Sequence, residues 1–181
     1  MQNFTALENV CLSLMLQGHN AKEARDIARS YLEKIGLSIE QSNKKVFELS
    51  GGQRQRIAFV RAIAPQFTVL FGDEPTGNLD KKTSFTLMQI LEDSIREKES
   101  SAVIVSHDID LSMKFADTII IIQKRPDTLN GESLDEYSGY LDNHCIFHKE
   151  NAGNNCLWAN TRKQYRTDEF KRDIEKMLDG S

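Results

Sequence analysis

Three short apolar runs, separated by helical segments, constrain the fold of this chain more than any other feature of its sequence. The runs cover residues 68–71, 102–105 and 118–122, and the segments 81–98 and 109–116 are expected to be helices. Short strands that alternate with helices are typical of βαβ units, in which helices cover both faces of a parallel sheet. The sequence therefore predicts an α/β fold in which the three strands pair in one parallel sheet.

The N-terminal part, residues 4–36, is expected to be helical. An amphipathic pattern follows Asn20, which has a glutamate three residues later as in a capping box, and it ends at Gly36. Another helix is expected from about residue 51 until Pro65 stops it. These helices precede and flank the first predicted strand.

Composition excludes several classes of protein. The 181 residues are 39% hydrophobic, enough for the core of one domain. The mean hydropathy is −0.48 and the longest aliphatic run, Ile119 to Ile122, is far shorter than the ~20 residues that span a bilayer. A net charge of −4 argues against a nucleic-acid partner. The N-terminus shows no secretory signal, and three scattered cysteines fit a reducing cytosol.

The segment from Leu49 to Arg56, Leu-Ser-Gly-Gly-Gln-Arg-Gln-Arg, has the residue types of an anion site. Gly51 and Gly52 open a helix, so their N–H groups are exposed with no Cβ to block close approach. The helix dipole adds partial positive charge there, and Ser50 adds a hydroxyl donor. A plain serine-capped helix is the alternative, and Ser-Gly-Gly alone would favour it.

Two carboxylates follow the first predicted strand. Asp73 and Glu74 end the run that begins at Val69. One carboxylate can hold Mg²⁺ through water, and the other can orient a water for attack on phosphorus. His107 follows the second strand and would lie beside the acids if the two strands are neighbours, since ligands sit beyond the carboxyl ends of parallel strands. A structural histidine is the alternative for His107.

A weaker constellation lies near the C-terminus. Four possible zinc ligands fall within thirteen residues: His144, Cys145, His148 and Cys156. They lack the Cys-x₂₋₄-Cys arm of common zinc sites. We therefore interpret 145–148 and 156–158 as the strands of a hairpin with incidental thiols, after turns at 124–143 and before a helix at 168–178.

Four of these segments, in this order and spacing, resemble the motifs of ATP-binding cassette (ABC) ATPases. The similarities are Leu-Ser-Gly-Gly-Gln at 49–53 to the signature motif, Val69–Glu74 to the Walker B strand, Gly77–Asp80 to the D-loop and His107 to the switch histidine. Thr5–Val10 is similar to the segment after the Q-loop. Together with Asp73–Asp80, this segment is most similar to the ABC systems of the lipoprotein-release and macrolide-export type. The resemblance covers residues 3 to about 123.

The resemblance implies a P-loop NTPase-like parallel sheet with a helical subdomain. It divides the chain into a helical subdomain at 1–48, the signature, Walker B and switch-histidine part of the ATPase core at 49–123, and a C-terminal appendage at 124–181. The family's phosphate loop reads Gly-x₄-Gly-Lys-Ser/Thr, and none of the ten glycines here precedes a lysine. We therefore expect an N-terminally truncated cassette that lacks the Walker A strand, loop and helix and is inactive alone.

By resemblance, the chain is part of an ATPase that couples ATP hydrolysis to transport, with ATP and Mg²⁺ as cofactors. The implied roles are γ-phosphate contact in trans for Ser50, Gly51 and Gly52, with support from Gln53; Mg²⁺ binding for Asp73; general base for Glu74; γ-phosphate contact for His107; and a bridge across the dimer for Asp80. The implied partners are a second cassette, head to tail, and a transmembrane permease facing the helices at 4–36. This places the protein in the cytoplasm, on the inner face of the cell membrane, without nucleic acid.

Two alternatives stay open. A soluble ABC ATPase of the DNA-repair type usually has an acidic residue after Ser-Gly-Gly and long coiled coils, whereas Gln53 follows here and no heptad run exists. A non-catalytic truncated cassette could instead offer its signature surface to an intact partner cassette. The missing phosphate-loop lysine favours this second alternative for the chain alone.

Overall fold

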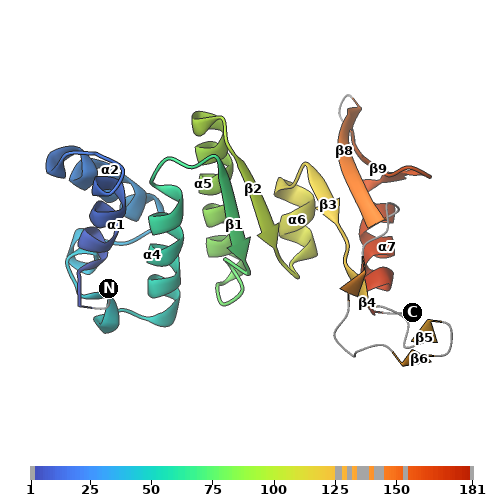
Figure 1. Cartoon of the computed structure of the whole chain (residues 1–181), viewed down its shortest axis with the longest axis horizontal. Coiled ribbons are helices and arrows are strands. Elements are labelled where there is room, and N and C mark those ends of the chain that lie inside the picture. Colours follow the sequence, from blue (N-terminus) through green and yellow to red (C-terminus); the bar gives the residue numbers. More distant parts are fainter. Residues whose placement is uncertain are drawn as a thin grey trace. The chain divides into compact units, whose positions relative to one another are not determined.

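The structure is a computed structural model that describes residues 3–124, 128–129, 132–133, 139–140, 145–152 and 155–179 (Figure 1). The chain forms two compact units, unit 1 at Met1–His107 and unit 2 at Asp108–Ser181. Each unit has its own hydrophobic core. The three-part division expected from the motifs stays a prediction.

Helices make up the N-terminal part of unit 1. They are α1 (Ala6–Met15), α2 (Ala21–Lys34), the short α3 (Ile39–Ser42), the 3₁₀ turn η1 (Val46–Glu48) and α4 (Gly51–Ile63). Capping boxes begin α1 and α2, and the one at Asn20 confirms the sequence prediction. Leu7, Val10 and Leu14 of α1 are buried where α1 packs against α2 and α4. The predicted helical N-terminus is therefore confirmed.

A two-stranded parallel sheet completes unit 1. Strand β1 (Val69–Asp73) pairs in parallel with β2 (Ser101–Val105), and α5 (Lys81–Lys98) connects them. One face of the sheet packs on the helical core through side chains such as Ile104. The Ile104 side chain also lies against Gly72, its partner on the neighbouring strand, where an added Cβ would be 2.8 Å from the Ile104 Cδ1. This is the predicted βαβ unit, with strand ends that differ by at most two residues from the predicted runs 68–71 and 102–105.

The other face of this sheet is apolar and open. Phe71 is 76% exposed and Val103 is 52% exposed, and Val69 and Val105 lie beside them. Continuous apolar runs are typical of strands that are covered on both faces. Val69 and Phe71 therefore lack cover on this face, whereas Ile104 packs against the helical core.

Unit 2 is built around an antiparallel sheet. Its main elements are α6 (Ile109–Phe115), β3 (Thr118–Ile120), β8 (Ile146–Ala152), β9 (Asn155–Ala159), β10 (Gln164–Arg166) and α7 (Thr167–Asp179). The order is β10-β9-β8-β3, with antiparallel pairs throughout. The hairpin and the C-terminal helix predicted from sequence are confirmed.

The prediction that residues 118–122 join the parallel sheet is wrong. Ile119 of β3 pairs with Phe147 of β8, because the downstream hairpin offers an antiparallel partner. The remaining short strands are β4 (Gln123–Lys124) with β7 (Gly139–Tyr140), and β5 (Thr128–Leu129) with β6 (Glu132–Ser133).

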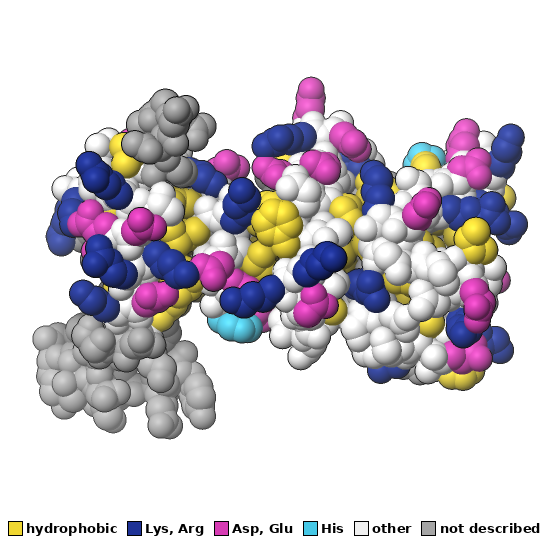
Figure 2. All heavy atoms as spheres, turned by 180° about the vertical axis from the view of Figure 1, so that it is seen from behind, with side chains coloured by type: hydrophobic (Ala, Val, Ile, Leu, Met, Phe, Trp, Pro, Cys, Tyr) yellow, Lys and Arg dark blue, Asp and Glu magenta, His cyan; other side chains and the backbone are white. Residues whose placement is uncertain are grey.

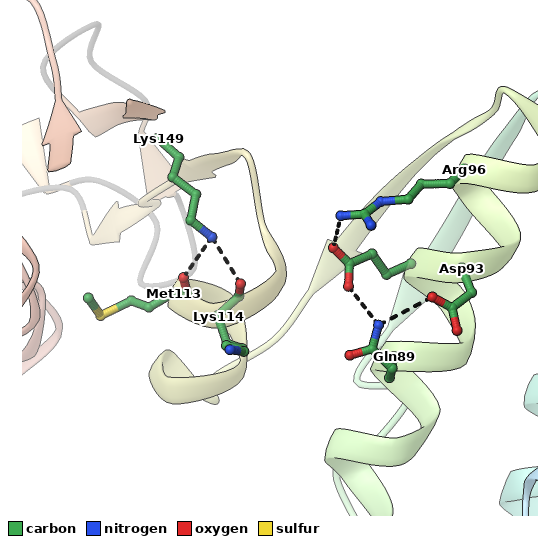
Figure 3. A network of polar contacts seen from close by, with 7 residues as sticks. Gln89, Asp93, Arg96, Met113, Lys114 and Lys149 are labelled. Carbon is green, nitrogen blue, oxygen red and sulfur yellow. Dashed lines mark hydrogen bonds and ion pairs between the residues drawn. The ribbon is translucent and has the colours of Figure 1, made fainter. Parts of the chain in front are cut away.

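Aromatic side chains form the core of unit 2. Phe170 stacks on Trp158 at 5.1 Å between ring centres and lies 4.7 Å from Phe147. Lys149 lies over Trp158 and donates to the carbonyls of Met113 and Lys114 at the end of α6 (Figure 3). A cation at a helix C-terminus stabilises the helix. Lys149 of β8 therefore stabilises the end of α6 and bonds this helix to the sheet.

Candidate functional site

The start of α4 presents free backbone donors to solvent. Ser50 is the N-cap: its Oγ accepts from the N–H of Gln53 at 3.3 Å, and the Gln53 side chain accepts from the Ser50 N–H at 2.9 Å. A Cβ on Gly51 would meet nothing within 4 Å. Exposed N–H groups, the helix dipole and the Ser50 hydroxyl proton together suit an anion. The two bonds of the capping box hold the first turn of α4 in place.

Glu74 and His107 meet at the carboxyl ends of β1 and β2. One carboxylate oxygen, Oε1 of Glu74, accepts from the His107 backbone N–H at 2.9 Å and lies 2.7 Å from the ring Nδ1. The two side chains are 37% and 78% exposed, so a ligand can reach them. The sequence prediction that His107 lies beside the acids is confirmed, because β1 and β2 are neighbours.

The backbone of Glu74 is strained. Its φ is 43°, in the left-handed region that non-glycine residues rarely adopt. Pro75 follows it, which disfavours helical angles at the preceding residue. Such a conformation costs about 1–3 kcal/mol and persists only where surrounding contacts impose it. Here the Glu74 N–H donates to the carbonyl of Val105 at 2.9 Å, and the Gly77 N–H donates to the Glu74 carbonyl at 3.2 Å.

The turn at residues 75–79, which follows Glu74, contacts α4 at two places. The side-chain amide of Gln55 in α4 donates to the carbonyl of Pro75 at 3.0 Å. A Cβ on Gly52 would lie 3.3 Å from a methyl group of Leu79, so this turn lies against the first turn of α4. In Figure 1 the start of α4 and the carboxyl ends of β1 and β2 lie at the same end of unit 1.

Asp80 closes the turn and begins α5. Its carboxylate accepts from the N–H of Thr83 at 3.0 Å and from the Thr83 hydroxyl at 2.7 Å. These bonds, the hydroxyl first, hold the pKa of Asp80 below its ordinary value. Asp80 is therefore ionised at neutral pH and is an N-cap within its own chain.

The structure brings most of the predicted site residues to one end of unit 1. Asp73 ends β1 and is exposed, opposite Val105. Sequence reasoning missed Gln55 and Leu79, which connect the anion site to the Glu74 turn. Gln55 lies within the Leu49–Arg56 segment, but its partner, the Pro75 carbonyl, is distant in sequence, and no local pattern indicates that partner.

The candidate zinc ligands do not form a site in the described part of the chain. Cys145 is buried in the unit 2 core, and the Nδ1 of His148 lies 3.0 Å from the hydroxyl of Thr118. His144 falls outside the described residues. No group of three or more metal-ligand side chains occurs among those that are described.

Acidic and basic side chains are interspersed on the face shown in Figure 2. No helix of the described residues is long and apolar enough to cross a membrane.

Comparison with known proteins agrees with the motifs. Residues 1–77 match the ABC transporter family model. The lipoprotein-releasing system ATP-binding protein LolD of Hahella chejuensis is 41% identical over 114 residues, which are 63% of this chain and 49% of that protein. The LolD of Acinetobacter baylyi is 43% identical over 124 residues, 68% of this chain and 54% of that protein.

Solved structures show the same relationship. The ATP-binding cassette MJ0796, in a dimeric post-hydrolysis state bound to ADP and Pi, aligns with a TM-score of 0.60 at 36% identity, over 66% of this chain and 53% of that one. The parallel βαβ unit and the motif-bearing turns thus define a P-loop NTPase-like α/β cassette. More particularly, the chain is similar to the ATP-binding proteins of ABC transporters, and it spans about half the length of the curated relatives it matches.

Proposed function

We propose that this chain belongs to the ATP-hydrolysing subunit of an ABC-type membrane transporter of the lipoprotein-release type. The observation that carries the proposal is the Glu74–His107 pair at 2.7 Å, at the carboxyl ends of two parallel strands and joined by one turn to a glycine-opened helix. An acid and an imidazole in contact suit activation of a water and sensing of a phosphate. The identity to LolD proteins supports the transporter assignment.

The residues present fit ATP and Mg²⁺. Asp73 offers an exposed carboxylate oxygen, the type of ligand that Mg²⁺ prefers, and would hold that ion. ATP and Mg²⁺, when bound, supply the phosphoryl group and neutralise its charge. Glu74 would act as general base toward the attacking water. His107 would donate to the γ-phosphate, with its other ring nitrogen held by Glu74.

The start of α4 would act across a dimer. Ser50, Gly51 and Gly52 would bind the γ-phosphate of an ATP held by a second cassette, with Gln53 holding Ser50 through the capping box. Asp80 would bridge the two cassettes from the turn beside them. The dimeric state of the MJ0796 cassette supports this partner. A membrane permease would be the other partner, which places the subunit on the cytoplasmic face of the membrane.

A second candidate function is a non-catalytic cassette that lends its signature surface to an intact partner. None of the ten glycines of the chain precedes a lysine, so a phosphate loop has to come from outside these 181 residues. A site with only part of its donors loses charge-assisted bonds worth ~1.5–3 kcal/mol each. The chain alone is therefore expected to bind ATP weakly and to hydrolyse none measurably.

The two candidate functions are distinguished by adding a phosphate loop to the chain. The chain is purified alone and as a chimera that carries the phosphate-loop portion of the MJ0796 cassette in front of residue 1. ATP binding is measured by calorimetry and phosphate release by a coupled assay. Turnover by the chimera but not by the chain alone supports the ATPase proposal. A chimera that folds and binds ATP but stays inactive favours the non-catalytic role.

A further inference from the structure

We propose that Gln55 is a positioning residue for Glu74: its side-chain amide holds the Pro75 carbonyl and so keeps the strained Glu74 backbone fixed relative to the start of α4. This inference rests on the proposed function, in which Glu74 is the general base. It concerns a contact within one chain, between the helix that presents the anion site and the turn that carries the acid.

The first step is the strain at Glu74. A residue with a φ of 43° before a proline returns to an extended conformation unless contacts on both sides prevent it. On the N-terminal side, the N–H of Glu74 is held by the carbonyl of Val105 in β2. On the C-terminal side, the N–H of Gly77 holds the Glu74 carbonyl from within the turn, and Pro75 has no N–H to contribute, so the Pro75 carbonyl is the group through which a contact from outside the turn acts.

The second step is that Gln55 holds this carbonyl. The bond is 3.0 Å long and joins residues 20 positions apart. Gln55 is half-buried in α4, and Thr76, the next residue after Pro75, is buried. A bond shielded from water competes less with solvent than an exposed bond. Gln55 therefore acts on the residue directly after the base.

The third step is that the turn has a second contact with α4. Leu79 lies against Gly52, where an added Cβ would come within 3.3 Å of a Leu79 methyl group. Gln55 and Leu79 thus attach the two ends of the turn to the same helix, three residues apart along it. The consequence is that the phosphate-facing start of α4 and the Glu74 carboxylate keep one spacing.

The test uses the full chain without nucleotide. Gln55→Met and Gln55→Glu remove the donor while keeping the length of the side chain, and Gln55→Lys restores a donor. Gln17→Met is the matched control. Gln17 also bonds a distant backbone, through the carbonyl and the N–H of Gln66, but it lies away from the site. Each variant is first checked for an unchanged thermal midpoint.

Two measurements follow. Hydrogen exchange of residues 72–80 reports the turn bonds of Gly77 and Leu79, and the ¹⁵N shift of the His107 ring reports its contact with Glu74. Gln55→Met and Gln55→Glu should speed exchange about three- to tenfold, the effect of one lost hydrogen bond, and should move the ring shift toward that of free imidazole. Gln55→Lys should restore both values, and Gln17→Met should change neither.

Unchanged exchange and an unchanged ring shift in Gln55→Met would overturn the proposal, as would equal changes in Gln17→Met. Neither measurement depends on ATP hydrolysis. An inactive chimera would therefore count against the proposed function alone, and an unaffected turn would count against Gln55 alone.

Discussion

Replacing Lys98 with methionine should loosen the far end of α4. The Lys98 ammonium donates to three carbonyls at that end, those of Ile63, Ala64 at 3.2 Å and Pro65 at 2.9 Å. Methionine keeps the apolar stem of the side chain but removes the charge. The Ala64 and Pro65 carbonyls would then lose their donor from α5, and the Ile63 carbonyl would keep only the weaker bond from the Ser94 hydroxyl at 3.4 Å.

The expected loss is about 2–3 kcal/mol. Hydrogen bonds to a charged group contribute ~1.5–3 kcal/mol each, but three bonds to one ammonium are not additive. Lys98 also lies 4.9 Å from the ring centre of Phe67, a cation–π contact worth ~0.5–1 kcal/mol. Burial lowers the pKa of Lys98, so desolvation offsets part of these gains. For a unit of this size the thermal midpoint should fall by roughly 8–15 °C.

The assay is urea unfolding followed by circular dichroism, with Lys34→Met as the matched control. Lys34 lies over the ring of Tyr31, as Lys98 does, but it is exposed, so its loss should cost less than ~0.5 kcal/mol. If Lys98→Met unfolded at the same urea concentration as the unchanged chain, or if Lys34→Met were equally damaging, the capping argument would be refuted.

Two further predictions concern surfaces and caps. Phe71→Ser should lower the fluorescence of a dye for exposed apolar surface and reduce self-association without lowering the thermal midpoint, because the ring is 76% exposed; unchanged dye binding would show that this face is covered. Asp80→Ala should lower the midpoint by removing the N-cap of α5, whereas Asp80→Asn should keep it. Since the folded pKa of Asp80 lies below its unfolded value, its stabilisation is present above about pH 4 and is lost as the pH falls through the folded pKa, so Asp80→Asn should unfold with a flatter acid limb. An identical acid limb in the two proteins would contradict this.

Local sequence patterns predicted most of the elements of unit 1. Helix α5 occupies the expected residues 81–98, and the strands follow the expected apolar runs, because helical periodicity, caps and strand composition are all short-range signals. The same signals do not choose a strand's partner. A β-branched run such as 118–120 fits a parallel or an antiparallel neighbour, and the hairpin that takes it lies about 25 residues further along the chain.

The candidate site was predicted only where its residues follow regular elements. The contact between Glu74 and His107 could be expected because the carboxyl ends of neighbouring parallel strands meet. The bonds from Gln55 to Pro75 and from Lys98 to the end of α4 could not, because a side chain reaching a backbone carbonyl over 20 or more residues leaves no periodic trace. The left-handed backbone of Glu74, whose N–H is held by the Val105 carbonyl, likewise leaves no local sequence signal.

The most direct test of the account is the turnover of the phosphate-loop chimera with Glu74→Gln. Glutamine keeps the shape of the side chain but cannot accept the proton of the attacking water, so turnover should fall about 10²–10⁴-fold while ATP binding stays intact. Glu40→Gln, which alters only an exposed ion pair with Lys44, should leave both unchanged. Near-normal turnover by Glu74→Gln would contradict the assignment of Glu74 as the base and, with it, the central claim that this strand end carries the chemistry.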